Sequence, residues 1–158
     1  MSGEAAGMQQ MDPVRRLRVL AAGVRGGMFA EGFIDAPPEG VWAVAADLEG
    51  ELPHLVPSVR SFRLMDDSGS RLRAVAVGPL GHRADFEVVL EYGWCLMQSP
   101  LVIGGMAAVA EGSGTRFAVL GGVRTAGLVP VAAVLRAVGA VRIGRMVERV
   151  RRRTAARR

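Results

Sequence analysis

The sequence predicts an α+β domain in which an antiparallel sheet is followed by one long C-terminal helix. Three observations support this fold class. Residues 29–64 read as strand, Pro-Pro, helix, short helix and strand. Residues 71–123 divide into short apolar segments separated by turn residues, the pattern of an antiparallel meander. From about Leu128 to Arg153, apolar residues recur at helical spacing. We therefore expect one domain with a sheet of about six or seven strands, and two short helices after the first strand.

The body of the chain opens with an abrupt change from strand to helix. A strand is expected at Phe29–Ile34, and Pro37-Pro38 follow it closely. Proline suits the first position of a helix because its φ is already helical and its missing N–H would have no partner there. We therefore expect a helix after this pair. A second short helix at Glu51–Val56 and a strand at Val59–Leu64 come next.

Further strands are expected in the rest of the body. Within His82–Glu91, apolar and charged residues alternate, which is typical of an antiparallel strand with one face buried and the other in water. The segments 78–81 and 111–114 are rich in glycine and have the composition of turns. The strands are expected at Arg71–Val77, His82–Glu91, Tyr92–Gln98, Leu101–Ala110 and Thr115–Val123.

The apolar stripe of the C-terminal helix changes direction along its length. The stripes of its two halves point roughly 130° apart in helical projection. Gly139 and Gly144 lie near the change. This pattern indicates either a kink, or a first half that gates a cavity and a second half that packs on the sheet. Arg142 falls near the apolar face of the first half, where it either reaches water at the edge of the domain or holds an anionic ligand group at a cavity mouth.

The chain is expected to divide into residues 1–28, 29–153 and 154–158. The first part holds a disordered segment and a short basic amphipathic helix, with Asp12 as its N-cap and Pro13 as its first residue. The middle part is the folded domain, and the last is an Arg-rich tail. Because the charge balance and the sequence pattern restart at Met28, we expect deletion of residues 1–27 to leave stability nearly unchanged. That helix would dock on the domain, on a partner or on a membrane surface.

The net charge of +5 is unevenly distributed. Residues 1–28 carry +2, residues 29–124 carry −5 and residues 125–158 carry +8. The basic residues lie at both ends, and the Arg-rich tail contains no aromatic residue of the kind that nucleic-acid readers place beside arginine. We interpret the run 149–158 as a solvated helix end and expect no specific nucleic-acid partner. The basic termini are candidates for weak contact with an anionic membrane surface. The sequence leaves the oligomeric state open.

Composition also excludes several classes of site. No apolar run is long enough to cross a membrane, and the first residues lack the apolar segment of a secretory signal, so a cytoplasmic location is expected. Cys95 is the only cysteine and is expected to be buried. His54 and His82 are the only histidines, and neither belongs to a cluster with metal-ligand spacing. We expect no metal and no cofactor, and no phosphate-binding loop or serine nucleophile motif is present.

The body of the chain contains four short motifs: APPEGVW, ADLEG, LPHLVPSV and GTR. Together with the order of the expected elements, they resemble the START-like, helix-grip superfamily (polyketide cyclase/dehydrase and lipid-transport type, SRPBCC). The resemblance covers residues 29 to about 153, expected as a START-like ligand-binding domain. It implies a curved sheet that grips the C-terminal helix, with the two short helices closing one end of a cavity.

This resemblance leaves two functions and the question of catalysis open. The first is binding or carriage of an apolar small molecule, such as a lipid, a quinone or a polyketide-like compound. The second is an aromatic polyketide cyclase/dehydrase. Enzymes of that branch carry an arginine on the strand after the two helices, and Arg73 looks like the matching position. It would polarise a ketone. Val59 stands where those enzymes carry a tyrosine, and the chain has no asparagine.

The cavity wall is expected to be apolar, with one or two polar anchors. Arg73 is the first candidate anchor and the candidate catalytic residue, and Arg142 is the second anchor. The alternative for Arg73 is an arginine that faces solvent on an edge strand. The expected wall residues are Trp42, Phe86, Val88, Trp94, Met106, Phe117, Leu128, Val131 and Leu135.

Overall fold

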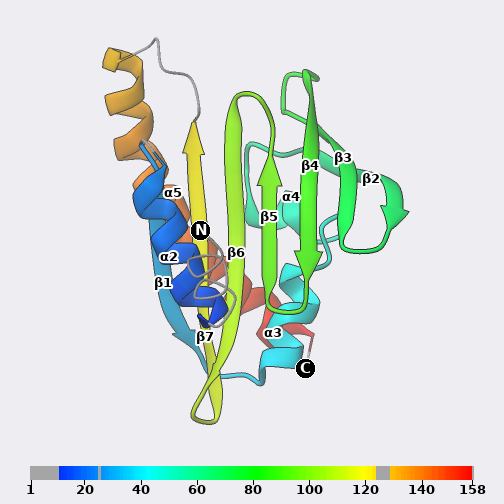
Figure 1. Ribbon diagram of the computed structural model, residues 1–158, viewed down its shortest axis with the longest axis vertical. Coiled ribbons are helices and arrows are strands. Elements are labelled where there is room, and N and C mark those ends of the chain that lie inside the picture. The colour runs from blue at the N-terminus through cyan, green and yellow to red at the C-terminus, as the bar shows by residue number, and fades with distance from the viewer. Residues whose placement is uncertain (1–10, 25, 124–128, 158) are drawn as a thin grey trace, which may run out of the picture.

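The computed structural model describes residues 11–24, 26–123 and 129–157, with the side chains of 66–68 and 129–142 outside the description. The helices and strands follow one another in the order that the sequence predicts, and Figure 1 shows their arrangement. The helices are α2 (Pro13–Gly23), α3 (Pro38–Ala45), α4 (Leu52–Leu55) and α5 (Val129–Ala156). The strands are β1 (Met28–Ile34), β2 (Ser61–Ser68), β3 (Arg71–Val77), β4 (Arg83–Glu91), β5 (Trp94–Gln98), β6 (Val102–Glu111) and β7 (Gly114–Val123).

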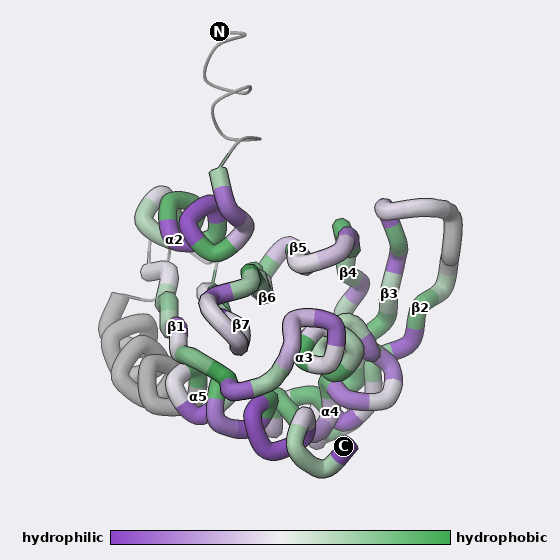
Figure 2. Tube along the Cα trace, turned by 90° about the horizontal axis from the view of Figure 1, so that it is seen from below, coloured by the Kyte–Doolittle hydropathy of each residue, from purple (hydrophilic) through white to green (hydrophobic). Residues whose placement is uncertain are grey.

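The strands form one antiparallel sheet of seven strands in the order β1-β7-β6-β5-β4-β3-β2. Strands β2 to β7 form a meander in chain order, and β1 pairs with β7, so that β1 and β2 are the two edge strands. The sheet curves, so that it has a concave and a convex face (Figure 2). The predicted α+β fold, with an antiparallel sheet around a C-terminal helix, is therefore confirmed.

Helices cover both faces of the sheet. Figure 2 shows α3, α4 and α5 on the concave side and α2 on the convex side. Each side has its own cluster of buried apolar residues. The concave cluster includes Phe62, Met106 and Phe117, whereas Trp94 and Leu120 belong to the convex cluster. The two clusters share the strands because successive side chains of a strand point to opposite faces.

The long helix α5 approaches the sheet closely where β1 and β7 carry glycine. A Cβ added at Gly121 would lie 2.6 Å from the Cδ1 atom of Ile143, and one at Gly32 would lie 3.0 Å from Val147. A side chain at either position would displace the Ile143 or Val147 side chain that packs there. The helix is continuous over residues 129–156. The side chains at the expected change of face near Gly139 lie outside the described residues.

The N-terminal helix α2 packs on the domain itself. The Asp12 side chain accepts a hydrogen bond of 2.9 Å from the backbone N–H of Arg15, which confirms the expected N-cap. Val14, Leu17 and Ala21 are buried against the convex face. The sequence left open whether this helix docks on the domain, on a partner or on a membrane surface, and the structure places it on the sheet of its own domain.

Candidate functional site

A cavity of about 470 Å³ lies between the concave face of the sheet, α4 and α5. This is within the size range of small-molecule sites, roughly 300–1,000 Å³. Its exposed lining residues include Ser58, His82 and Val102, which lie where strands begin or end at the same end of the sheet. We take this end as the mouth. The apolar lining side chains include Leu52, Leu55, Phe62, Phe86, Met97, Met106, Ile143 and Met146.

Two of the predicted wall residues, Phe86 and Met106, line this cavity. Trp42, Val88 and Phe117 lie in the same concave cluster but are not among the lining residues. They are almost completely buried, at 6%, 1% and 0% exposure. These three side chains therefore belong to the core that supports the cavity rather than to its wall.

Trp94 faces the other side of the sheet, contrary to the expectation that it lines the cavity. Its neighbours on β5, Cys95 and Met97, point into the concave cluster. Trp94 is buried under α2, and the Arg16 guanidinium lies 4.1 Å from a ring centroid of the indole. Because β5 is buried on both faces, its apolar composition could not show which side chains point to the cavity.

Arg73 also points away from the cavity, which corrects its assignment as anchor and catalytic residue. On β3, Leu72 and Ala74 are buried and Arg73 between them is exposed. The residue opposite it on β4 is Glu87, which is exposed as well. Arg73 faces solvent from an interior strand, since β3 lies between β2 and β4. Its guanidinium cannot polarise a ketone on the concave side.

The remaining predicted site residues lie outside the description. Leu128 is outside the described residues altogether. The helix α5 includes Val131, Leu135 and Arg142, but the side chains of these residues are not described. Their roles in the wall and at the mouth stay predictions.

Among the described residues, the cation that lines the cavity is Arg149, on the second half of α5. It is half-buried, and its Nη1 donates a hydrogen bond of 3.1 Å to the backbone carbonyl of Leu55, the last residue of α4. The sequence analysis assigned Arg149 to a solvated run. The sequence did contain a signal for this position, because apolar residues flank Arg149 on the helix: Met146 lies one turn before it and Val150 follows it directly. Both residues are buried in the structure.

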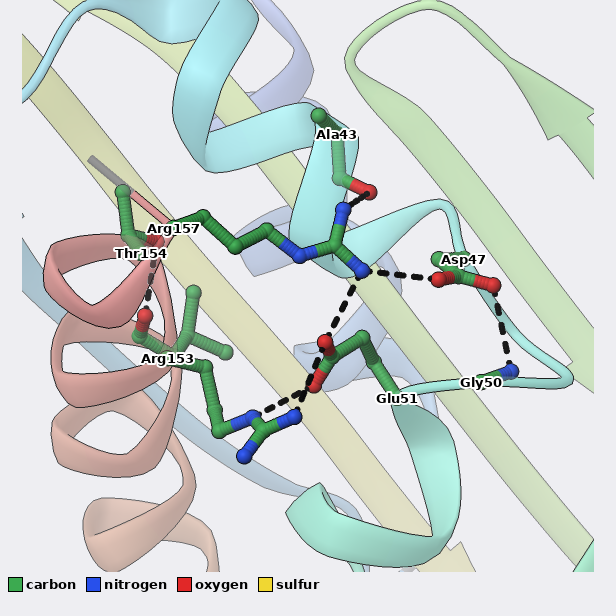
Figure 3. Close-up of polar contacts among 8 residues, drawn as sticks. Ala43, Asp47, Gly50, Glu51, Arg153, Thr154 and Arg157 are labelled. Atoms are coloured by element: carbon green, nitrogen blue, oxygen red, sulfur yellow. Dashed lines mark hydrogen bonds and ion pairs between the residues drawn. The ribbon is translucent and has the colours of Figure 1, made fainter.

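Two further arginines follow Arg149 at intervals of four residues, so the three share one face of α5. Figure 3 shows Arg153 and Arg157 converging on the Glu51 carboxylate. Arg153 Nε donates at 2.7 Å and Arg157 Nη2 at 2.8 Å. Arg157 Nη2 also donates to Asp47, at 2.8 Å. We call Arg149, Arg153 and Arg157 the arginine row.

The arginine row holds α4 at both ends, because Glu51 is the residue before its first turn and Leu55 is its last. The Glu51 side chain is only 4% exposed. The hydrogen bond from Arg153 is the main cause that lowers the pKa of this carboxyl, against a smaller opposing effect of burial, and Arg157 lowers it further. The end of α5 is therefore not simply solvated, and Thr154, in the expected tail, is 3% exposed.

Other reactive groups do not form a site on the described part of the chain. Cys95 is buried, and desolvation raises the pKa of its thiol to about 12, so it is a thiol rather than a nucleophilic thiolate. No group of histidine, cysteine and carboxylate side chains within the described ranges could hold a metal ion. None of the described helices is both long and apolar enough to span a membrane.

Comparison with known proteins supports the fold. No protein-family model matches the sequence, and a search of curated proteins finds no match. Among solved structures, TTHA0849 from Thermus thermophilus is 22% identical, with a TM-score of 0.65 over 82% of this chain and 97% of that one. The Zhui aromatase/cyclase from Streptomyces sp. R1128 is 15% identical, with a TM-score of 0.66 over 83% and 94%.

A third similar structure is the di-domain ARO/CYC StfQ from the steffimycin biosynthetic pathway. It is 10% identical, with a TM-score of 0.67 over 90% of this chain and 54% of that protein. At sequence identities of 10–22%, structural similarity to these proteins shows a shared fold. The protein therefore has the helix-grip fold that its sequence predicted.

Proposed function

We propose that this protein binds and carries an apolar small molecule in the cavity under α4 and α5. The observation that supports this most is the wall itself, which combines Phe62, Phe86, Met97, Met106 and Met146 around about 470 Å³ of space. Methionine side chains adapt to ligands of different shape.

Titration with Nile red, a neutral dye whose fluorescence rises in apolar surroundings, tests this proposal. We expect saturable binding to the wild-type protein and displacement by lauryl alcohol. Gly104→Leu is the informative variant. A Cβ at Gly104 would meet Met97 Cε at an ordinary 3.6 Å, so the new side chain would extend toward the cavity that both residues line. We expect this variant to lose most Nile red binding.

Gly40→Leu is the matched control, because Gly40 is exposed on α3 with no atom within 4 Å of an added Cβ. It should bind Nile red as the wild type does. Equal binding by both variants would show that the dye binds elsewhere. Absence of saturable binding to the wild-type protein would mean that the cavity is not used for apolar ligands.

A second candidate, cyclisation of an aromatic polyketide, is favoured by the structural likeness to two proteins named aromatase/cyclase. The described polar side chains that line the cavity are Ser58, His82 and Arg149, and Arg73 is not one of them. Any such reaction would therefore use a different arrangement from the one expected around Arg73. Co-expression with a minimal polyketide synthase would test it. A changed pattern of aromatic products, lost in Gly104→Leu, supports cyclisation.

A further inference from the structure

We propose that the preferred ligand is an amphiphile with a single acidic group, and that Arg149 holds this group. The inference rests on the proposed binding function and names the chemical class of the ligand. A carboxylate would lie beside α4, and the apolar body would extend along the sheet toward the mouth of the cavity.

The first argument is the charge of Arg149. Several arginines of α5 are paired: Arg151 and Arg152 with Glu148, and Arg153 and Arg157 with Glu51. Arg149 is half-buried, yet no described carboxylate lies within 4.0 Å of it, and the described partner of its guanidinium is the carbonyl of Leu55. A partly desolvated cation with no counter-charge is costly, and an anionic ligand would remove this cost.

The second argument is the supply of hydrogen-bond donors. A guanidinium has five N–H groups in a planar fork, which matches the two oxygens of a carboxylate. The carbonyl of Leu55 uses one nitrogen of Arg149. That bond fixes the guanidinium against α4 and leaves other donors for a ligand. A carboxylate bound in this way would receive charge-assisted hydrogen bonds that an alcohol of the same length cannot match.

The third argument is the direction of the lining along α5. Ile143, Met146 and Arg149 follow one another at intervals of three residues, and all three line the cavity. The apolar and cationic ends of this row are about 9 Å apart along the helix. Ile143 packs over Gly121, near the mouth, whereas Val147 packs over Gly32, farther from it. Arg149 is therefore at the inner end, which sets the orientation of an amphiphile.

The experiment compares laurate with lauryl alcohol as competitors of Nile red at pH 8, where the carboxylic acid is ionised. We expect the wild-type protein to bind laurate about tenfold more tightly than lauryl alcohol, the size of one charge-assisted hydrogen bond. In Arg149→Gln, the preference should fall to about onefold to twofold, with lauryl alcohol affinity nearly unchanged. Arg145→Gln is the control, since Arg145 is exposed on the same helix and its loss changes the net charge equally.

Each outcome decides the matter. If Arg149→Gln weakens both competitors equally, or Arg145→Gln removes the preference as fully, Arg149 acts only by positioning α4 or through long-range charge, and the inference is overturned. The wild-type comparison needs no variant. If the wild type binds both competitors equally, the cavity has no acid site, although the proposed function stands. If neither competitor displaces the dye, the proposed function itself fails.

Discussion

Replacement of Leu17 by alanine should destabilise the whole domain. Leu17 lies on the face of α2 that packs on the sheet, and it is 0% exposed. A Cβ added at Gly105 would lie 2.9 Å from the Cδ1 atom of Leu17, so the leucine packs directly on the backbone of β6. Leu→Ala substitutions in cores cost about 2–5 kcal/mol. A surface helix can settle into part of the space, so we expect about 2–3 kcal/mol. For a chain of this length, that loss lowers the Tm by about 4–12 °C.

Differential scanning calorimetry of the full chain measures this shift, with Val19→Ala as the control. Val19 lies on the same helix but is 48% exposed, and its replacement should cost no more than about 0.5 kcal/mol. The sequence pattern led us to expect that deletion of residues 1–27 would leave stability nearly unchanged, and the packing of α2 reverses this expectation. The deletion should cost more than about 2 kcal/mol, because it removes Val14, Leu17 and Ala21 and uncovers Trp94. If Leu17→Ala melts at the same temperature as Val19→Ala, α2 does not stabilise the domain in solution and the argument is refuted.

Two further predictions concern buried ionisable groups. Glu51→Gln should cost about 1–2 kcal/mol at pH 7, between an exposed and a fully buried ion pair. Because the folded-state pKa of Glu51 is lowered, its contribution is present above the ordinary carboxyl range and is lost as the pH falls through the folded value. Chemical denaturation should therefore show the two proteins converging on acidification, and a constant difference down to pH 3 contradicts this. Cys95, with a thiol pKa of about 12, should react with a disulfide reagent only on unfolding, and a fast native-state reaction argues against its burial.

Most elements of the fold were predictable from local sequence signals. The Asp12-Pro13 and Pro37-Pro38 pairs mark helix starts because capping and the fixed φ of proline act within a few residues. Alternation located β4 to within one residue at its start. The side chains that make up the cavity were harder to predict. Alternation separates two faces of a strand, but it does not say which face is concave when both are buried, as for Trp94 on β5.

Arg73 shows a different cause of error. The pattern of β3, with Leu72, Ala74 and Ala76 on one face, already places Arg73 on the other. The resemblance to the cyclase branch nevertheless placed Arg73 in the cavity. That assignment was wrong because it used the position of the residue along the chain and not the direction of its side chain. The alternative, an arginine that faces solvent on an edge strand, was correct in its exposure to solvent and wrong about the strand, since β3 lies inside the sheet.

The sequence by itself determined the antiparallel sheet, the helix starts and the amphipathic character of α2, since each depends on neighbours along the chain. Only the tertiary structure decided that α2 covers the convex face and that Arg149 lines the cavity. It also decided that Arg153 and Arg157 bind Glu51 across 102 and 106 residues of chain. A run of arginines has the same local pattern whether water or a buried carboxylate faces it. The difference arises when the fold brings α4 beside α5, because the partner of each charge is then chosen by packing in space.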